Sequence, residues 1–238
     1  AGDIARHLGV PASRLHVVPL GVEPAFAPPR PGQVEELRRR LELPQRYGLY
    51  LGGFDSRKNL GLLLQAWGEV HRTTGLPLLL GGRPPRAGDP FAPHPAELAT
   101  GAGLPPAAWP LLGPVPEADP PSLLGGAAVF AFPSRYEGFG LPPLEALACG
   151  APVVAARASS LPEVLGDAGL LVDPNDAAAW VQALVSIVED PALAATLAQA
   201  GPRRAAGFSW AATARATWEV YGAALGLVWE GGRRRAAD

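Results

Sequence analysis

The chain has 238 residues and a formal net charge of −2, which suits one large domain, or one domain plus a fragment, and excludes a general attraction for nucleic acid. Cys149 is the single cysteine, so no internal disulfide can form and a reducing, cytoplasmic compartment is expected. The histidines show no metal-ligand spacing, no apolar run reaches the length of a membrane span, and no signal peptide is visible. Methionine is absent and the first residues resemble the middle of a helix, so we expect a segment of a longer chain.

Taken in chain order, residues 1–24 predict a helix, a turn and then a strand with the sequence HVVPLGV. Further on, short apolar runs without period-two alternation are separated by amphipathic helices, as expected for strands buried on both faces. The predicted strands are Tyr47–Leu51, Leu76–Leu80, Val129–Phe132, Pro152–Ala155 and Gly169–Val172. This alternation predicts an α/β fold with a doubly wound parallel sheet and right-handed crossovers.

Cap residues mark where the helices are expected to begin. The predicted starts are Asn59, Asp119, Leu141, a capping box at Ser160–Glu163, Asn175 or Asp176, and Ser209, whose helix runs to about Leu225. Arg83–Pro116 is rich in Pro and Gly and is predicted to be a loop with a short helix near Pro95–Thr100. The basic runs Arg38–Arg40 and Arg233–Arg235 are predicted to be solvated surface, with a weak membrane-surface role as the alternative.

Ligands of doubly wound sheets bind beyond the carboxyl ends of the strands, so the loops that follow strands are the candidate sites. After the first strand, Gly52 and Gly53 allow a tight turn, and Arg57 and Lys58 then sit at the predicted start of a helix. A basic pair is unfavourable there unless it meets an anion, which indicates a ligand phosphate; a surface pair is the alternative. Lys58 is also the only lysine among 20 basic residues, which suggests that its site needs a compact point charge.

The loop after Val129–Phe132 has the sequence PSRYEGFGLPPLE and leads into a helix. Gly138 and Gly140 leave backbone N–H groups available at a helix N-terminus, where anions bind. Glu137 and Glu145, eight residues apart, can both face one cleft and accept hydrogen bonds from sugar hydroxyls. A hydrolase acid/base pair is one alternative, and glutamates that only favour the helix dipole are another.

The string EGFGLPPLE resembles the E-x7-E motif of glycosyltransferase family 4. Similar strings follow the family's order over nearly the whole chain: YLGGFDSRKNLGLLLQAW, then VFAFPSRYEGFGLPPLEALACGAPVVAARASSLPEVLGDAGLLVDPND, then FSWAATARATWEVY. The resemblance implies one half of a GT-B fold, in which two Rossmann-like domains face each other across a cleft. Residues 1–24 would be the tail of the N-terminal acceptor domain with the interdomain linker, and 25–238 the nucleotide-sugar-binding domain with a C-terminal crossover helix.

The resemblance also implies roles for single residues. Lys58 would hold the donor's diphosphate, Glu137 the transferred sugar and Glu145 the ribose, with no metal or other cofactor and with retention of anomeric configuration. The predicted donor-binding set is Gly52, Gly53, Arg57, Lys58, Pro133, Ser134, Glu137, Gly138, Phe139, Gly140, Leu141 and Glu145, of which Glu137 and Lys58 are predicted to be catalytic. Gly53 departs from relatives that carry an arginine there, and Arg57 is expected to compensate.

The resemblance implies a donor-binding glycosyltransferase domain that takes GDP-mannose or a UDP-sugar and passes a hexose to a glycan or lipid-linked acceptor held by the N-terminal domain. The alternatives are a binding module without turnover and another GT-B enzyme, such as a nucleotide-sugar epimerase. We expect the isolated chain to bind donor weakly and to transfer little sugar. By analogy, the full-length protein would be cytoplasmic, with peripheral association at the inner face of the membrane.

Overall fold

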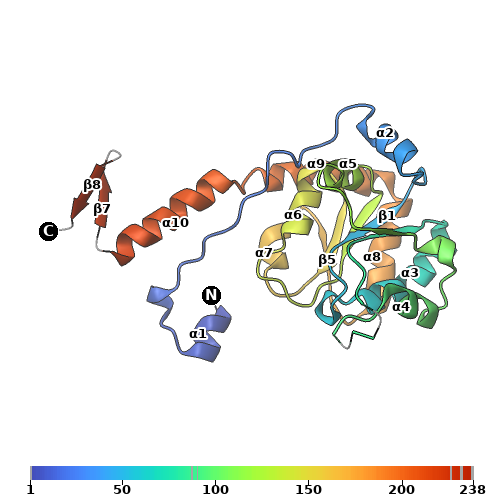
Figure 1. Ribbon diagram of the computed structural model, residues 1–238, viewed down its shortest axis with the longest axis horizontal. Helices are drawn as coiled ribbons and strands as arrows, with labels where there is room; N and C mark the ends of the chain where they lie inside the picture. Colours follow the sequence, from blue (N-terminus) through green and yellow to red (C-terminus); the bar gives the residue numbers. More distant parts are fainter. Residues whose placement is uncertain (1, 87, 90, 226, 231–232, 237–238) are drawn as a thin grey trace. The chain divides into compact units, whose positions relative to one another are not determined.

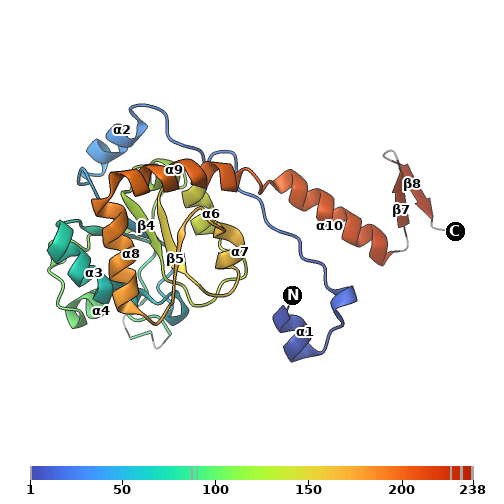
Figure 2. The same cartoon turned by 180° about the vertical axis from the view of Figure 1, so that it is seen from behind.

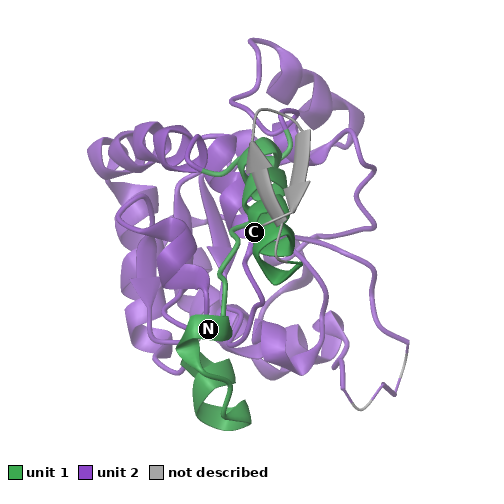
Figure 3. Ribbon diagram, turned by 90° about the vertical axis from the view of Figure 1, so that its left-hand side faces the viewer, with its two compact units in different colours: residues 1–23, 208–238 green, residues 24–207 purple. Residues whose placement is uncertain are grey.

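The computed structural model describes residues 2–86, 88–89, 91–225, 227–230 and 233–236. These fall into two compact units, one of residues 1–23 and 208–238 and the other of residues 24–207 (Figure 3). The larger unit holds the predicted sheet and the two candidate loops.

Within the described part of the larger unit, six parallel strands lie in the order β3-β2-β1-β4-β5-β6. Their bounds are β1 Gly48–Leu51, β2 Leu78–Gly81, β3 Leu111–Gly113, β4 Val129–Phe132, β5 Val153–Ala156 and β6 Leu170–Val172. The strand order reverses between the central neighbours β1 and β4, which is the topological switch point where doubly wound sheets bind ligands. The predicted α/β doubly wound parallel sheet is therefore confirmed.

The strands form because their side chains are apolar on both faces and both faces are covered. β2, β4 and β5 are buried along their whole length. A glycine opens β1 for a packing reason: a Cβ on Gly48 would lie 2.1 Å from the ring of the fully buried Trp67. The indole Nε1 of Trp67 donates to the carbonyl of Leu76 at 3.1 Å, so this large ring is buried without an unpaired polar atom.

Helices cover both faces of the sheet, and Figures 1 and 2 show the two helical layers from opposite sides. On one face, α3 packs against α4 and α8, and α8 lies on β4, β5 and β6; on the other, α6 lies on β4 and β5 and packs against α5, α7 and α9. The bounds in this unit are α2 Gln33–Arg40, α3 Leu60–Thr74, α4 Pro95–Gly101, α5 Pro120–Gly125, α6 Leu141–Ala148, α7 Leu161–Leu165, α8 Ala177–Glu189 and α9 Pro191–Ala205. Short 3-10 turns, η2 at Ser56–Lys58 and η3 at Pro106–Ala108, complete the unit.

Some elements of the larger unit differ from the prediction. The predicted loop Arg83–Pro116 contains the expected short helix, α4, but also β3, which is only three residues long and stands at the edge of the sheet between two prolines. The helices α2 and α9 were not predicted, although Asp190 caps α9 through Oδ1, which accepts from the N–H groups of Ala192 and Leu193. Asp176 caps α8 in the predicted manner.

The basic run Arg38–Arg40 is not simply solvated surface, because α2 packs against α5. The Arg38 guanidinium donates to the carbonyl of Gly126 at 3.4 Å, and the Arg40 guanidinium pairs with the buried Asp119 carboxylate. The side chains of the second basic run, Arg233–Arg235, lie outside the described residues.

The smaller unit contains α1 Gly2–Leu8, η1 Ala12–Arg14, α10 Trp210–Ala224 and a hairpin of β7 Leu227–Glu230 with β8 Arg233–Ala236. The predicted strand HVVPLGV is wrong: its described residues make only an isolated bridge, between Val22 and Ser209, because no neighbouring strand supplies a ladder. Ser209 caps α10 as predicted, since Oγ accepts from the N–H of Ala212 at 3.2 Å. No residue of α10 is buried within the described structure.

Among the described residues, no single helix is long and apolar enough to cross a membrane; α8 and α9, which meet at a 95° bend, reach the required length and hydropathy only as a pair.

Candidate donor site

The candidate site lies at the topological switch point, where two loops leave neighbouring strands. The turn η2 follows β1, and the loop of residues 133–140 follows β4 and leads into α6. The two loops are joined by a backbone hydrogen bond from the N–H of Arg135 to the carbonyl of Arg57 at 2.8 Å. The carboxyl ends of β1 and β4 therefore bring together Lys58 and Glu137, which stand 79 residues apart in the chain.

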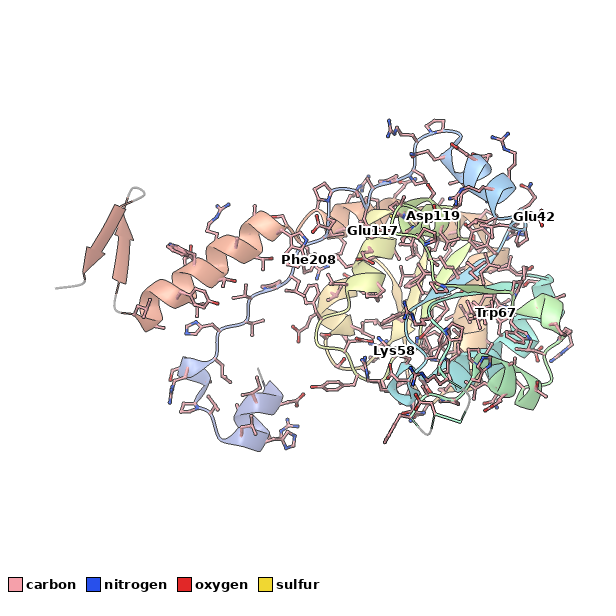
Figure 4. The ribbon with its side chains drawn as sticks, viewed as in Figure 1. Glu42, Lys58, Trp67, Glu117, Asp119 and Phe208 are labelled. Carbon is pink, nitrogen blue, oxygen red and sulfur yellow. The ribbon has the colours of Figure 1, made fainter. Side chains whose placement is uncertain are left out.

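Lys58, labelled in Figure 4, is 7% exposed and its ammonium group is held in place from two sides. Its Nζ donates to Oε1 of Glu137 at 2.6 Å and lies 5.2 Å from the centre of the Phe132 ring. Lys58 is the last residue of the turn η2, and Asn59 takes a left-handed conformation (φ 58°) before α3 begins. Lys58 is thus close to the start of α3, as predicted, but a 3-10 turn and not the helix itself positions it.

Asn59 does not cap α3 with its side chain, which corrects the prediction from the sequence. Its Nδ2 instead donates to the carbonyl of Pro174 at 2.8 Å and ties the start of α3 to the loop after β6. A side chain committed to this distant carbonyl is not available to the first N–H groups of the helix.

Glu137 accepts from two cations. Besides Lys58, the guanidinium of Arg57 lies 3.4 Å from Oε2 of Glu137, while Arg57 Nε contacts the Asp55 carboxylate at 3.0 Å. Burial raises the pKa of Glu137, but hydrogen bonds from Lys58 and Ser134 and the charges of Lys58 and Arg57 outweigh burial, so the pKa lies below its ordinary value. The Glu137 carboxylate is therefore ionised at neutral pH and forms an ion pair with Lys58 in this structure.

The glycine-rich segment between the two glutamates presents backbone donors. The N–H groups of Gly138, Gly140 and Leu141 meet no acceptor within the described residues, and the prolines at 142 and 143 have no N–H group. Gly140 has a φ of 111°, and a Cβ at this position would lie 2.8 Å from Cδ2 of Leu161. Such free amides at a helix N-terminus form an anion-binding arrangement.

Glu145 lies one turn into α6 and its surroundings differ from those of Glu137. The residue is half-buried, and burial raises the pKa of its carboxyl group. Within the described residues, the Glu145 carboxylate makes no hydrogen bond or ion pair. The Glu145 charge and, above all, burial raise the pKa of Cys149 to about 12, which agrees with the predicted inert, buried thiol.

The remaining predicted residues shape the two loops. The N–H of Gly52 donates to the carbonyl of Gly81 at 3.0 Å and extends the pairing of β1 with β2, and the carbonyl of Gly53 accepts from the hydroxyl of Tyr50. Pro133 follows β4 directly, and the buried Ser134 hydroxyl lies 3.4 Å from the carbonyl of Arg57 and 3.3 Å from that of Tyr136. The contacts of these residues with a donor, like those of Phe139, stay predictions.

Two residues that were not predicted as site residues, Ser159 and Ser160, hold the glycine loop from the segment after β5. The N–H of Glu137 donates to Ser159 Oγ at 2.9 Å, and Ser160 Oγ donates to the carbonyl of Phe139 at 2.6 Å and lies 3.2 Å from that of Glu137. The expected capping box is wrong, because the Ser160 side chain makes no capping bond to α7. Its S-L-P-E sequence fits a helix start, and only the fold reveals the distant carbonyls.

No group of three or more His, Cys, Asp or Glu side chains gathers as metal ligands in the part of the chain that the structure describes. The expectation that the reaction needs no metal stays a prediction.

Comparison with known proteins gives the family. The model of the "Glycosyl transferases group 1" family matches residues 45–190. O-antigen chain mannosyltransferase B of Escherichia coli is 37% identical over 212 residues, which cover 87% of this chain and 54% of that protein. The chain thus spans about half the length of this curated relative.

Solved structures share the fold. Sucrose-phosphate synthase from Thermosynechococcus elongatus matches with a TM-score of 0.76 and 28% identity, over 94% of this chain and 55% of that one. Anabaena Alr3699/HepE, solved in complex with UDP and glucose, matches with a TM-score of 0.79 and 22% identity, over 90% of this chain and 59% of that one. The fold is that of GT-B glycosyltransferases, with the Rossmann-like sheet predicted from the sequence. With a family match over residues 45–190 and a relative at 37% identity, the chain belongs to the group 1 glycosyl transferases.

Proposed function

We propose that this chain supplies the donor-binding domain of a retaining glycosyltransferase, which transfers a hexose from a nucleotide-diphosphate sugar to a glycan or lipid-linked acceptor. One observation carries the proposal: at the switch point, a buried lysine stands beside a loop in which the N–H groups of Gly138, Gly140 and Leu141 meet no acceptor among the described residues. A fixed ammonium group and free backbone amides both bind phosphate groups in proteins.

The chemistry follows from the charge that develops when the bond between sugar and diphosphate breaks. The leaving nucleoside diphosphate gains negative charge, which Lys58 and the amides of Gly138, Gly140 and Leu141 would stabilise. For this, Glu137 must release Lys58 when the donor binds and turn its carboxylate to the hydroxyls of the transferred sugar. Glu145, which has no polar partner among the described residues, would accept from the ribose hydroxyls.

The donor is GDP-mannose or a UDP-sugar. A relative named as a mannosyltransferase favours GDP-mannose, while the Anabaena neighbour was solved with UDP and glucose. In both cases the diphosphate is the shared chemistry, so the roles of Lys58 and the loop amides do not depend on the base.

The acceptor would be bound by a part of the protein outside this chain, since the chain matches only 54% of the length of the E. coli relative. We propose a cytoplasmic protein with an N-terminal acceptor-binding domain, residues 1–24 being the tail of that domain and the linker, and with peripheral association at the inner face of the membrane. A nucleotide-sugar-binding module without turnover is the alternative, and Gly53, where the family resemblance implies an arginine, is the residue that favours it.

Calorimetric titration of the chain with UDP, GDP, ADP and GDP-mannose tests the proposal. We expect one base to be selected, and Lys58→Ala and Glu145→Ala each to abolish or strongly weaken its binding. Arg72→Ala and Glu69→Ala are matched controls, because this exposed pair on α3 lies outside the site; both should bind as the parent chain does.

Failure of every nucleotide to bind a folded chain would contradict the donor-binding role. Binding that survives Lys58→Ala would place the nucleotide somewhere other than the switch point. Transfer of sugar by the longer protein, measured as release of the nucleoside diphosphate, separates the enzyme from the binding module.

A further inference from the structure

The segment after β5 lies beneath the glycine loop and controls the direction of its peptide units. Ser160 Oγ donates to the carbonyl of Phe139 at 2.6 Å and lies within 3.2 Å of the carbonyl of Glu137. The carbonyl of each residue shares a planar trans peptide unit with the N–H of the next residue, and the two groups point in opposite directions. A hydroxyl that draws in the carbonyls of residues 137 and 139 therefore turns the N–H groups of Gly138 and Gly140 away from itself.

These two N–H groups are among those without an acceptor in the described structure. The peptide unit between Tyr136 and Glu137 is held in the reverse orientation, with its N–H toward the serines. The N–H of Glu137 donates to Ser159 Oγ, and the carbonyl of Tyr136, on the other side, accepts from Arg57 at 3.0 Å. Three peptide units of the loop, those joining residues 136–137, 137–138 and 139–140, are thus anchored on the two serines, and the N–H groups of Gly138 and Gly140 are left on the outer side.

The local backbone shows that this anchoring has a cost. Ser159 has a φ of 47°, a left-handed conformation that is unfavourable for a residue with a side chain. Ser160 precedes α7, but its hydroxyl bonds to the loop and does not cap the first N–H groups of that helix. Both serines therefore hold the loop, while Ser159 keeps an unfavourable backbone conformation and α7 lacks a side-chain cap.

We propose that Ser160 is a positioning residue of the donor site, which holds the Gly138 and Gly140 amides in the direction required to bind the phosphate groups of the donor. The inference rests on the proposed function, since it assigns those amides to the diphosphate. It also predicts which ligand group is affected: the phosphates, and not the base.

The test compares Ser160→Ala with Ser160→Thr, which keeps a hydroxyl, and with Ser186→Ala. Ser186 is a matched control, because its hydroxyl also donates to a backbone carbonyl, that of Ala183 at 2.9 Å, within α8. Calorimetry with inorganic pyrophosphate, UDP and GDP should show about tenfold weaker binding for Ser160→Ala and less than about twofold change for the other two variants. Because Ser160 does not cap α7, its urea midpoint should stay close to that of Ser186→Ala.

A second measurement follows the amides directly. In the parent chain, the backbone amide resonances of Gly138 and Gly140 should shift when pyrophosphate is added, and in Ser160→Ala these shifts should be lost at equal free ligand concentration. Parent-like pyrophosphate binding by Ser160→Ala would overturn the inference alone, provided that Lys58→Ala abolishes binding and the proposed function stands. A parent chain that binds none of the three probes would overturn the proposed function and this inference together.

Discussion

Glu137 and Glu145 carry the same carboxylate at the two ends of one motif, yet the fold gives them opposite electrostatic surroundings. Glu137 lies between Lys58 and Arg57, and its pKa is lowered although burial alone would raise it. Glu145 is half-buried in α6 without such cations among the described residues, and burial raises its pKa. Position relative to the switch point, and not residue type, therefore decides which carboxylate is paired with a cation before a ligand arrives.

The largest effect should come from breaking the ion pair of Glu137. Lys58→Met keeps the aliphatic stem against Phe132 but leaves a mostly buried carboxylate with only the partly exposed Arg57, so the free energy of unfolding should fall by about 2–3 kcal/mol. Urea denaturation at pH 7 measures this. Arg72→Met, which breaks an exposed pair with Glu69, should cost less than about 0.5 kcal/mol. Equal costs for the two variants would show that burial adds nothing to the Lys58 pair.

Gly140 separates the two carboxylates, since the loop ends and α6 begins there. Gly140→Ala should lower the free energy of unfolding by about 2 kcal/mol, because φ is 111° and the new Cβ would lie 2.8 Å from Leu161 Cδ2. Gly138→Ala is the matched control, with no atom within 4 Å of its Cβ and no positive φ, and should cost about 0.5 kcal/mol or less. If both glycines tolerate alanine equally, backbone conformation does not fix the start of α6.

Releasing Lys58 should sharpen the contrast in binding. Glu137→Gln removes the charge that occupies Lys58, so UDP or GDP, whichever the parent chain selects, should bind about fivefold more tightly, which corresponds to about 1 kcal/mol. Glu145→Gln lacks this effect and should bind the nucleotide less tightly than the parent. Weaker binding by Glu137→Gln would mean that Glu137 helps to hold the diphosphate and does not compete for its site.

The two carboxylates should also respond to pH with opposite sign. Because the folded-state pKa of Glu137 is below its ordinary value of 4.5, its stabilising contribution is present above pH 4.5 and is lost as the pH falls through the folded pKa. The folded-state pKa of Glu145 is raised, so the penalty for its ionisation grows as the pH rises above 4.5. Urea denaturation at pH 3–7 should therefore show Glu145→Gln slightly stabilised at pH 7 and Glu137→Gln destabilised there. Identical pH profiles for the two variants would contradict this difference.

Much of the larger unit could be predicted because its signals are local. A continuous apolar run predicted β4 with the bounds that the structure has, and the helix predicted to begin at Leu141 is α6. The loops after β1 and β4 were identified as the site because parallel strands place their carboxyl ends together. The pairing of Lys58 with Glu137 was not predicted, because each residue was assigned to a ligand and neither to the other.

Other features depend on partners that are distant in the sequence. Ser160 contacts carbonyls 21 and 23 residues away, and its pattern fits a capping box equally well. Asn59 donates a hydrogen bond to the carbonyl of Pro174, 115 residues away, and Arg40 donates one to the carboxylate of Asp119, 79 residues away. Such contacts follow from the packed layers, and no local pattern distinguishes them from caps or solvated surface.

The buried thiol of Cys149 has a practical consequence. It is the only sulfur-bearing side chain among these 238 residues, it is 2% exposed at the end of α6, and its raised pKa keeps it protonated at neutral pH. Alkylating reagents attack thiolates, so they should modify the native chain only when the segment around α6 opens. The alkylation rate therefore reports how often the helix that carries Glu145 opens, and a bound nucleotide should lower this rate.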